Sequence, residues 1–212
     1  MTCTLYIVRH GQSHENVDFR KGPAGRGHDL TPLGIRQVSE LRTHLKDKKI
    51  DAFFSSHLLR AAHSAAILAH ERGLTVQSDE RLAERRVELD EASEQKVWHH
   101  PELLYGDPSE LSDDALWDWK PFPDMESQRE SLNRFIRGLN DAGAAYQGKT
   151  VCVVTHGQVM RLFLIHLGYG SFKTFPLIRN GSIRNAGWAR VQSGKDGFVL
   201  QESSGITVLP EK

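Results

Sequence analysis

Two short apolar runs, each followed within one residue by His-Gly-Gln, constrain the fold of this chain more than any other feature. Residues 4–8 read TLYIV and residues 151–155 read VCVVT, without alternation of apolar and polar residues. Nearly continuous apolar runs of this length are typical of strands that are buried on both faces of a parallel sheet. The sequence therefore predicts two interior strands, with His10 and His156 at their carboxyl ends.

Helical and strand-like patterns alternate along the rest of the chain. Residues 30–48 have apolar residues at helical spacing, with Thr31 as the N-cap and Pro32 at the first helical position. Residues 57–73 form an alanine-rich pattern that we expect Ser56 to cap and Gly73 to close. We expect further strands at 51–56 and 74–79, further helices at 127–148 and 158–168, and a hairpin over 182–192 and 197–203.

This order of elements predicts an α/β fold. We expect a three-layer α/β/α sandwich with a mostly parallel mixed central sheet, in which the hairpin forms an antiparallel edge. Residues 1–212 are expected to form a single domain. A small helical insertion at about 92–125, acidic and rich in tryptophan, interrupts the alternation. It is either a surface elaboration with an aromatic core of its own or a lid over the substrate pocket.

The charge and cysteine content narrow the classes of function. Lys plus Arg equals Asp plus Glu, 27 each, so no overall basic field favours nucleic acid or a membrane surface. Cys3 and Cys152 lack the spacing of a metal site and are expected to be reduced core residues, with a disulfide or a metal pair as the alternatives. The first ten residues already contain a strand, which leaves no room for a signal peptide, and no run is as long as a membrane span. We therefore expect a cytoplasmic protein.

Polar residues at the predicted strand ends indicate an anion site. Ligands bind beyond the carboxyl ends of the strands in open α/β sheets, where His10 and His156 are expected to meet. The glycine after each histidine permits a tight turn and lets backbone N–H groups approach an anion. Arg9 suits phosphate or carboxylate oxygens, and Arg60 lies in the second turn of a predicted helix that follows a strand. Taken alone, Arg60 is also consistent with a solvated residue on a helix. His156 alone is also consistent with a histidine at a strand end whose hydrogen bonds are made by nearby residues.

The motifs taken together resemble a known family. They are RHGQS at 9–13 with Asn16, DLTPLGIRQ at 29–37, SSHLLRAAHSA at 55–65, RLAER at 81–85, MESQRESLNRFI at 125–136 and VVTHGQVMRLFL at 153–164. In this order they resemble the histidine phosphatase superfamily, the phosphoglycerate-mutase-like enzymes. The resemblance extends over nearly the whole chain.

This resemblance implies a mechanism for phosphoryl transfer. By carry-over, His10 is the nucleophile and forms a phosphohistidine that water then hydrolyses. Arg9 and Arg60 favour its neutral form by lowering its pKa, and with His156 they bind the phosphoryl group and stabilise the transition state. These groups supply the positive charge, so neither a metal nor another cofactor is expected.

The resemblance also assigns a proton donor and further phosphate contacts. Glu84 aligns with the acidic residue of the family and is expected to protonate the leaving group. The sequence after it, RRVELDEASEQ, contains no glycine where many members have one, so the backbone there is expected to differ. Asn16, Gly157 and Gln158 match positions that contact phosphate, although Asn16 also suits a helix cap.

Three functions remain open at this point. The length and motifs favour a phosphatase that acts on a small phosphorylated metabolite. A phosphoglycerate mutase is the alternative, because Arg85 and Arg86 are suited to hold a substrate carboxylate, although surface arginines explain them equally. A catalytically weak, phosphate-binding regulatory protein is the second alternative. The oligomeric state, monomer or homodimer, is left open.

Overall fold

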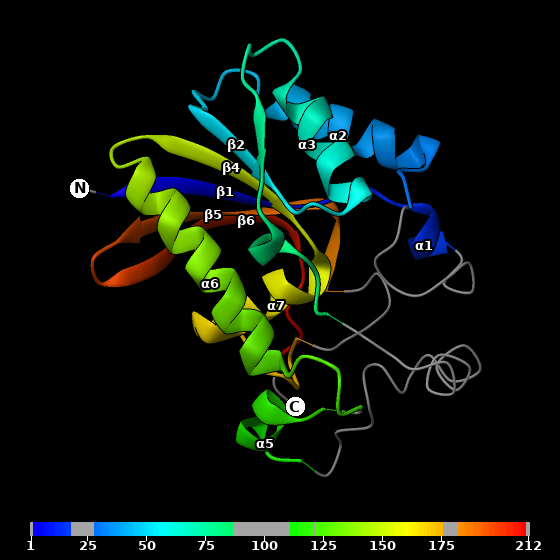
Figure 1. Ribbon diagram of the computed structural model, residues 1–212, viewed down its shortest axis with the longest axis vertical. Coiled ribbons are helices and arrows are strands. Elements are labelled where there is room, and N and C mark those ends of the chain that lie inside the picture. Colours follow the sequence, from blue (N-terminus) through cyan, green and yellow to red (C-terminus); the bar gives the residue numbers. More distant parts are fainter. Residues whose placement is uncertain (1, 18–27, 87–110, 121, 176–181, 211–212) are drawn as a thin grey trace.

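A six-stranded sheet forms the centre of the computed structural model, which describes residues 2–17, 28–86, 111–120, 122–175 and 182–210 (Figure 1). The strand order is β3-β2-β4-β1-β5-β6. The strands are β1 (Cys3–Arg9), β2 (Ala52–Ser55), β3 (Val76–Ser78), β4 (Thr150–Thr155), β5 (Ile183–Gly194) and β6 (Gly197–Ile206).

The sheet is mixed, as predicted. β1 pairs in parallel with β4, which also pairs in parallel with β2, and β3 extends this parallel part. β5 runs antiparallel to both β1 and β6. The predicted hairpin therefore forms the antiparallel edge, and β1 and β4 are the two interior strands that their apolar runs indicate.

Helices cover both faces of this sheet, which confirms the three-layer prediction (Figure 1). The helices are α1 (His14–Val17), α2 (Pro32–His44), α3 (Leu59–Ala69), the 3₁₀ helix η2 (Glu80–Leu82), α5 (Asp113–Asp118), α6 (Gln128–Ala145) and α7 (Gly157–His166). Side chains of β1 alternate between two cores: Leu5 and Ile7 pack with α6 and α7, whereas Tyr6 and Val8 pack with α2 and α3. β4 alternates in the same way.

The predicted ends of α3 are wrong. Ser56 does not cap this helix: Leu58 is the N-cap, and the N–H of Ser56 pairs with the carbonyl of Val154 in β4. The Oγ of Ser56 instead accepts a hydrogen bond from the Leu58 N–H, at 3.2 Å. The helix also ends at Ala69, before Gly73, whose positive φ of 67° belongs to the following turn. As a result Arg60 lies in the first turn of α3, close to the end of β2.

Most of the predicted insertion at 92–125 lies outside the described residues. Within its described part, α5 packs on α6, and the Trp117 ring contacts Phe172 at 4.8 Å between ring centroids. Cys3 and Cys152 are both free and buried, and burial raises their pKa values to about 11 and about 12. In the described part of the chain no helix is long and apolar enough to cross a membrane.

The turn after β1 rests directly on the backbone of α2. A Cβ placed on Gly11 would lie 2.5 Å from the carbonyl oxygen of Gly34, and one on Gly34 would lie 2.0 Å from the carbonyl oxygen of Gln12. Neither approach leaves room for a side chain, since the obstructing atoms belong to the backbone. The position of the turn that carries His10 therefore depends on the absence of side chains at both glycines.

We expect Gly34→Ala to lower the free energy of unfolding by about 3 kcal/mol, because the added methyl group must push α2 away from the turn. Urea unfolding measures the change. Gly138→Ala in α6 is the matched control: the added methyl lies 3.2 Å from the end of the Leu82 side chain and at ordinary contact distances, 3.4 and 3.7 Å, from Arg81 Cβ and Asp79 Oδ2. Alanine also has the higher helix propensity, so this variant should stay within about 1 kcal/mol of the parent. Equal losses in both variants would contradict the packing argument.

Candidate active site

His10 is fixed by backbone hydrogen bonds to strands on both sides of β1. Its N–H donates to the carbonyl of Thr155 at the end of β4, at 3.0 Å. Its own carbonyl accepts from the N–H of Ala186 and from the side-chain amide of Asn185, both at 3.2 Å. Because these partners come from β4 and β5, the sheet itself sets the position of the residue.

The hydrogen bonds of the His10 ring define its tautomer. The side chain is buried, and its Nδ1 lies 2.7 Å from the carbonyl oxygen of Gly11, to which only a protonated nitrogen can donate. Arg60 donates from Nε to the His10 Nε2 at 3.2 Å. Since arginine has no acceptor, Nε2 must carry the lone pair. Burial, followed by the charges of Arg60 and Arg9, holds the pKa of His10 well below its ordinary value.

His156 lies beside His10 because their strands are paired. Arg9 stands opposite Thr155 in the parallel register, so the next residues are neighbours, and the two rings lie 5.1 Å apart between centroids. The side chain of His156 is fully buried, yet neither of its ring nitrogens has a hydrogen-bond partner among the described residues. Burial, then the charge of Arg60, lowers the pKa of His156 well below its usual value. A buried, neutral imidazole of this kind is suited to bind a ligand.

Two buried arginines complete this part of the site. Arg9 donates from Nη1 to the carbonyl of Ile183 and lies against the start of α7, where a Cβ on Gly157 would be 3.1 Å from its Nε. Arg60 reaches both His10 and the carboxylate of Glu15, whose Oε2 is 2.9 Å from its Nη1. The guanidinium of Arg60 therefore lies between a neutral imidazole and an acid.

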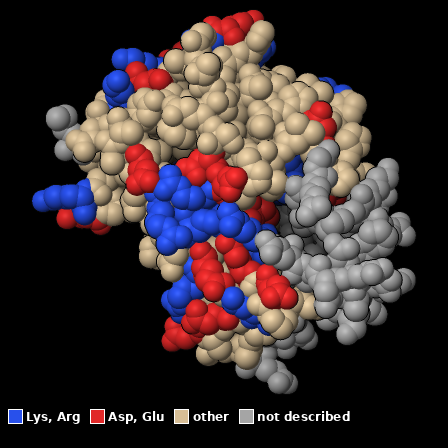
Figure 2. Space-filling view, viewed as in Figure 1, with Lys and Arg blue, Asp and Glu red and all other residues tan. Residues whose placement is uncertain are grey.

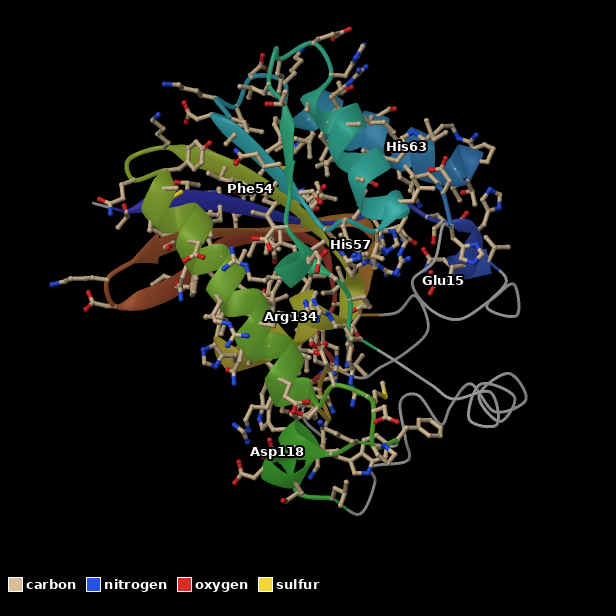
Figure 3. The ribbon with its side chains drawn as sticks, viewed as in Figure 1. Glu15, Phe54, His57, His63, Asp118 and Arg134 are labelled. Carbon is tan, nitrogen blue, oxygen red and sulfur yellow. The ribbon has the colours of Figure 1, made fainter. Side chains whose placement is uncertain are left out.

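Sequence reasoning missed Glu15 and Asn185. Glu15 lies on α1, directly after the RHG turn at 9–13, and its side chain is only 11% exposed (Figure 3). An acidic residue directly before Asn16 is the signal that could have identified it. Asn185 belongs to β5, and nothing in the local sequence of that hairpin marks it. It enters the site only because β5 pairs with β1.

Asn16 faces the turn that follows β1. Its Oδ1 accepts hydrogen bonds from the N–H and the hydroxyl of Ser13, at 3.1 and 3.2 Å, and from the amide of Asn185, at 3.1 Å. Asn16 is thus bonded to the RHG turn and, through Asn185, to the carbonyl of His10. In the structure its carbonyl oxygen braces the turn.

Glu84 lies at the N-terminus of α7, the helix that begins directly after His156. Its carboxylate accepts from the N–H groups of Gln158 and Val159, and from that of Arg85, each at 3.1 Å. The side-chain amide of Gln158 donates to the side-chain oxygen of Gln128, at 3.4 Å. The structure therefore brings Glu84 to the same helix terminus as His156, where backbone N–H groups and the helix dipole favour negative charge.

The described residues contain no group of three or more His, Cys, Asp or Glu side chains that could hold a metal ion. The chemistry of the site is that of two cationic guanidiniums, two neutral imidazoles and nearby carboxylates. Such a set can bind an oxyanion, offer a nitrogen nucleophile and supply an acid.

Comparison with known proteins agrees with this chemistry. Residues 5–204 match the histidine phosphatase superfamily (branch 1). The chain is 27% identical to "Probable phosphoglycerate mutase GpmB" of Proteus mirabilis, covering 98% of this chain and 95% of the relative. It is 30% identical to the adenosylcobalamin/alpha-ribazole phosphatase of Escherichia coli, covering 77% and 78%. A mycobacterial glucosyl-3-phosphoglycerate phosphatase, solved in complex with VO3, has a similar fold, with a TM-score of 0.68, 22% identity, and coverage of 98% and 99%.

The two neutral histidines predict how stability depends on pH. Unfolded histidine takes up a proton near pH 6.5, whereas buried His10 and His156 do so only at much lower pH. The unfolded state therefore binds more protons below pH 6.5, and the free energy of unfolding falls as the pH is lowered. Between pH 7 and 5 each histidine should contribute a loss of about 2 kcal/mol.

Between pH 7 and 5, the free energy of unfolding of His156→Gln, measured with urea, should fall by about 2 kcal/mol less than that of the wild type, because one of the two histidines is absent. His70→Gln serves as the control, because the side chain of His70 is 65% exposed, and this variant should follow the wild-type curve. Carboxylates with lowered pKa values, such as Glu126, lose their stabilising effect only below about pH 4.5, outside this interval. Identical pH dependence in His156→Gln and the wild type would contradict the prediction.

Proposed function

From the premise that this chain belongs to the histidine phosphatase superfamily, we propose that it is a metal-independent phosphomonoesterase acting through a phosphohistidine at His10. The observation that carries this proposal is the His10 ring, buried and neutral, with the Nε2 lone pair held by Arg60. Beside it, His156 offers two ring nitrogens with no partner among the described residues. A phosphoryl group bound here would meet a nucleophile and cations together.

The first step transfers the phosphoryl group to His10. The Nε2 lone pair attacks phosphorus, so that an N–P bond forms while the bond to the leaving oxygen breaks. Arg60, which donates to Nε2 in the free protein, shifts its N–H to a phosphoryl oxygen, and Arg9 and His156 donate to the others. The Gly11 carbonyl keeps the proton on Nδ1 and stabilises the positive charge that develops on the ring.

Glu84 supplies the proton for the leaving group and then takes one from the water that hydrolyses the phosphohistidine. In the free protein its carboxylate is bound by the N–H groups of Gln158 and Val159. The acid role therefore requires it to turn from these amides toward the leaving oxygen. A bound phosphate, which competes for the same N–H groups and repels the carboxylate, favours that movement and the uptake by Glu84 of a proton from solvent, which Glu84 then passes to the leaving oxygen. Asn16, Gly157 and Gln158 are proposed as the remaining phosphate contacts.

A small phosphorylated metabolite is the proposed substrate. The relatives include enzymes named as alpha-ribazole and glucosyl-3-phosphoglycerate phosphatases, and one named as a phosphoglycerate mutase. Against mutase activity here, Arg85 is not a surface residue. Its Nε and Nη2 donate to the carbonyls of Glu126 and Trp119, at 2.6 and 3.2 Å, and burial lowers its pKa to about 10. Its guanidinium is thus used by the backbone rather than held ready for a substrate carboxylate.

Two further features accompany the proposed activity. The free, buried thiols of Cys3 and Cys152 support a reducing compartment, and we propose the cytoplasm. The net charge of zero supports a small-molecule substrate rather than nucleic acid. The second alternative, a weak phosphate-binding regulatory protein, loses support because the proposed nucleophile and both pocket arginines are present and buried.

We expect the purified protein to hydrolyse p-nitrophenyl phosphate in EDTA, and His10→Ala to abolish turnover while circular dichroism shows a folded chain. Rapid quenching should trap a phosphate label that is labile in acid and stable in base, as a phosphohistidine is, and His10→Ala should lack it. His70→Ala, which removes an exposed imidazole, should keep wild-type turnover. Activity retained in His10→Ala would rule out the mechanism.

The same preparation distinguishes phosphatase from mutase. With a phosphoglycerate as substrate, release of inorganic phosphate should exceed exchange of phosphate between the two hydroxyl positions. Faster exchange than release would favour the mutase instead.

For Glu84→Gln we expect a loss of kcat of about 100-fold or more on an alkyl phosphate, whose alkoxide needs a proton to leave. The loss on p-nitrophenyl phosphate should be less than about 10-fold, since nitrophenolate leaves without one. Glu80→Gln, in which the replaced side chain is 76% exposed, is the matched control and should behave as wild type on both substrates. Equal losses on both substrates in Glu84→Gln would assign the acid role elsewhere.

A further inference from the structure

We propose that Arg134, paired with Glu126, is a positioning residue that holds Glu84 in place for proton transfer. This inference rests on the acid role proposed for Glu84. Arg134 lies on α6 where that helix passes the segment following η2 (Figure 3). Its side chain is buried. Among the described residues that take part in the proposed reaction, it contacts Glu84 alone, through the backbone carbonyl.

All five N–H groups of the Arg134 guanidinium have acceptors. Nε donates to Glu126 Oε1 at 2.8 Å, and Nη2 to Glu126 Oε2 at 2.7 Å. Nη1 donates to the carbonyls of Arg81 and Ala83, at 2.8 and 3.0 Å, and Nη2 to the carbonyl of Glu84, at 3.1 Å. One side chain therefore binds three carbonyls of the short segment that ends at the proposed acid.

Glu126 holds the same segment from the other side of Glu84. Its Oε2 accepts from the N–H of Arg86 at 2.8 Å, and its own N–H donates to the Arg86 carbonyl at 3.0 Å. Its carbonyl accepts from Arg85 Nε, and Ser131 also donates to Oε2. Burial alone raises the pKa of Glu126, but hydrogen bonds from Arg134 and the Arg86 amide bring it below its ordinary value. The pair stays ionised at neutral pH.

Glu84 thus sits between two anchors. Its backbone and both flanking stretches are fixed by the Arg134–Glu126 pair, and its carboxylate reaches across to the N-terminus of α7. An acid must meet the leaving oxygen within hydrogen-bond distance, and misplacement by about 1 Å can cost about 100-fold in rate. Loosening the pair should therefore impair the step that needs the proton and spare the step that does not.

The contacts of Arg134 differ from those of the charged residues on the surface of the same helix. Figure 2 shows Lys and Arg side chains next to Asp and Glu on the face of the molecule that carries α6. Arg129 of α6, for example, pairs with Asp118 at 2.7 Å, and the two side chains are 48% and 64% exposed. Such exposed pairs are screened by water and contribute little to stability. Arg134 is 5% exposed and binds backbone carbonyls, so it helps to fix the position of the backbone there.

Arg134→Lys tests the proposal, because it keeps the positive charge opposite Glu126 but replaces a planar group of five donors with a three-donor ammonium. The measurement is the ratio of kcat on p-nitrophenyl phosphate to kcat on an alkyl phosphate, at a temperature where each variant is folded by circular dichroism. We expect Arg134→Lys to raise this ratio by about 10-fold or more. In Glu84→Gln/Arg134→Lys the ratio should match that of Glu84→Gln alone, because the acid is already absent.

Arg161→Lys is the matched control. Arg161 of α7 is an equally buried arginine that donates to the carbonyls of Phe175 and Phe172 and to none of the described residues 81–86, and burial lowers its pKa to about 10. Its replacement should lower stability and leave the ratio of the two kcat values unchanged. A raised ratio in this control would show that the ratio reports general damage rather than the position of the acid.

Glu126→Gln is the second variant, in case Arg134→Lys does not fold. It preserves size but presents an amide N–H₂ to Arg134 in place of an acceptor, and the ratio should rise in the same direction. If Glu84→Gln raises the ratio but neither Arg134→Lys nor Glu126→Gln does, the positioning role is wrong and the acid assignment stands. If Glu84→Gln leaves the ratio unchanged, the acid assignment is wrong and the positioning role is rejected with it.

Discussion

The parallel pairing of β1 with β4 is the constraint on which the rest of the site depends. Its register places Arg9 opposite Thr155, so the residues that follow, His10 and His156, meet at one edge of the sheet. Both strands are buried on both faces by helices, which leaves them no freedom to slip. The turn after β1 is then held against the backbone of α2, and α7 begins at His156. Every other group is arranged around these two imidazoles.

One set of charges has two effects in this site. Arg9 and Arg60 would attract an anionic phosphoryl group, and burial together with the same charges keeps the imidazoles of His10 and His156 unprotonated. A nucleophilic histidine needs its lone pair, and a pocket for phosphate needs positive charge, so the two requirements reinforce each other. Glu15 limits the positive charge by pairing with Arg60, which otherwise would be a buried charge beside the neutral ring of His10.

Much of this arrangement could be predicted from the sequence, because it depends on local patterns. The apolar runs, the helical spacing and the hairpin turn together indicate the sheet, and the strand ends mark His10 and His156. What could not be predicted depends on contacts between distant segments. Asn185 and Arg134 act through hydrogen bonds to backbone carbonyls, which leave no mark in the sequence around them. The predicted start of α3 was wrong for a related reason, since Ser56 still pairs with β4 and the helix begins three residues later, at Leu59.

The position of β1 in the sheet has a consequence for how the chain folds. This strand comes first in the sequence, yet both of its neighbours, β4 and β5, are made from residues beyond 149. During synthesis β1 therefore has both edges unpaired until the residues of β4 and β5 have been made, and pairings over such long sequence separations form slowly. The carbonyl of His10 can accept its hydrogen bonds from Asn185 and Ala186 only after β5 has been made and has paired with β1. His10 is thus made well before the strands that fix its position, and a stretch of the chain that stops short of β4 contains β1 without either of its neighbours.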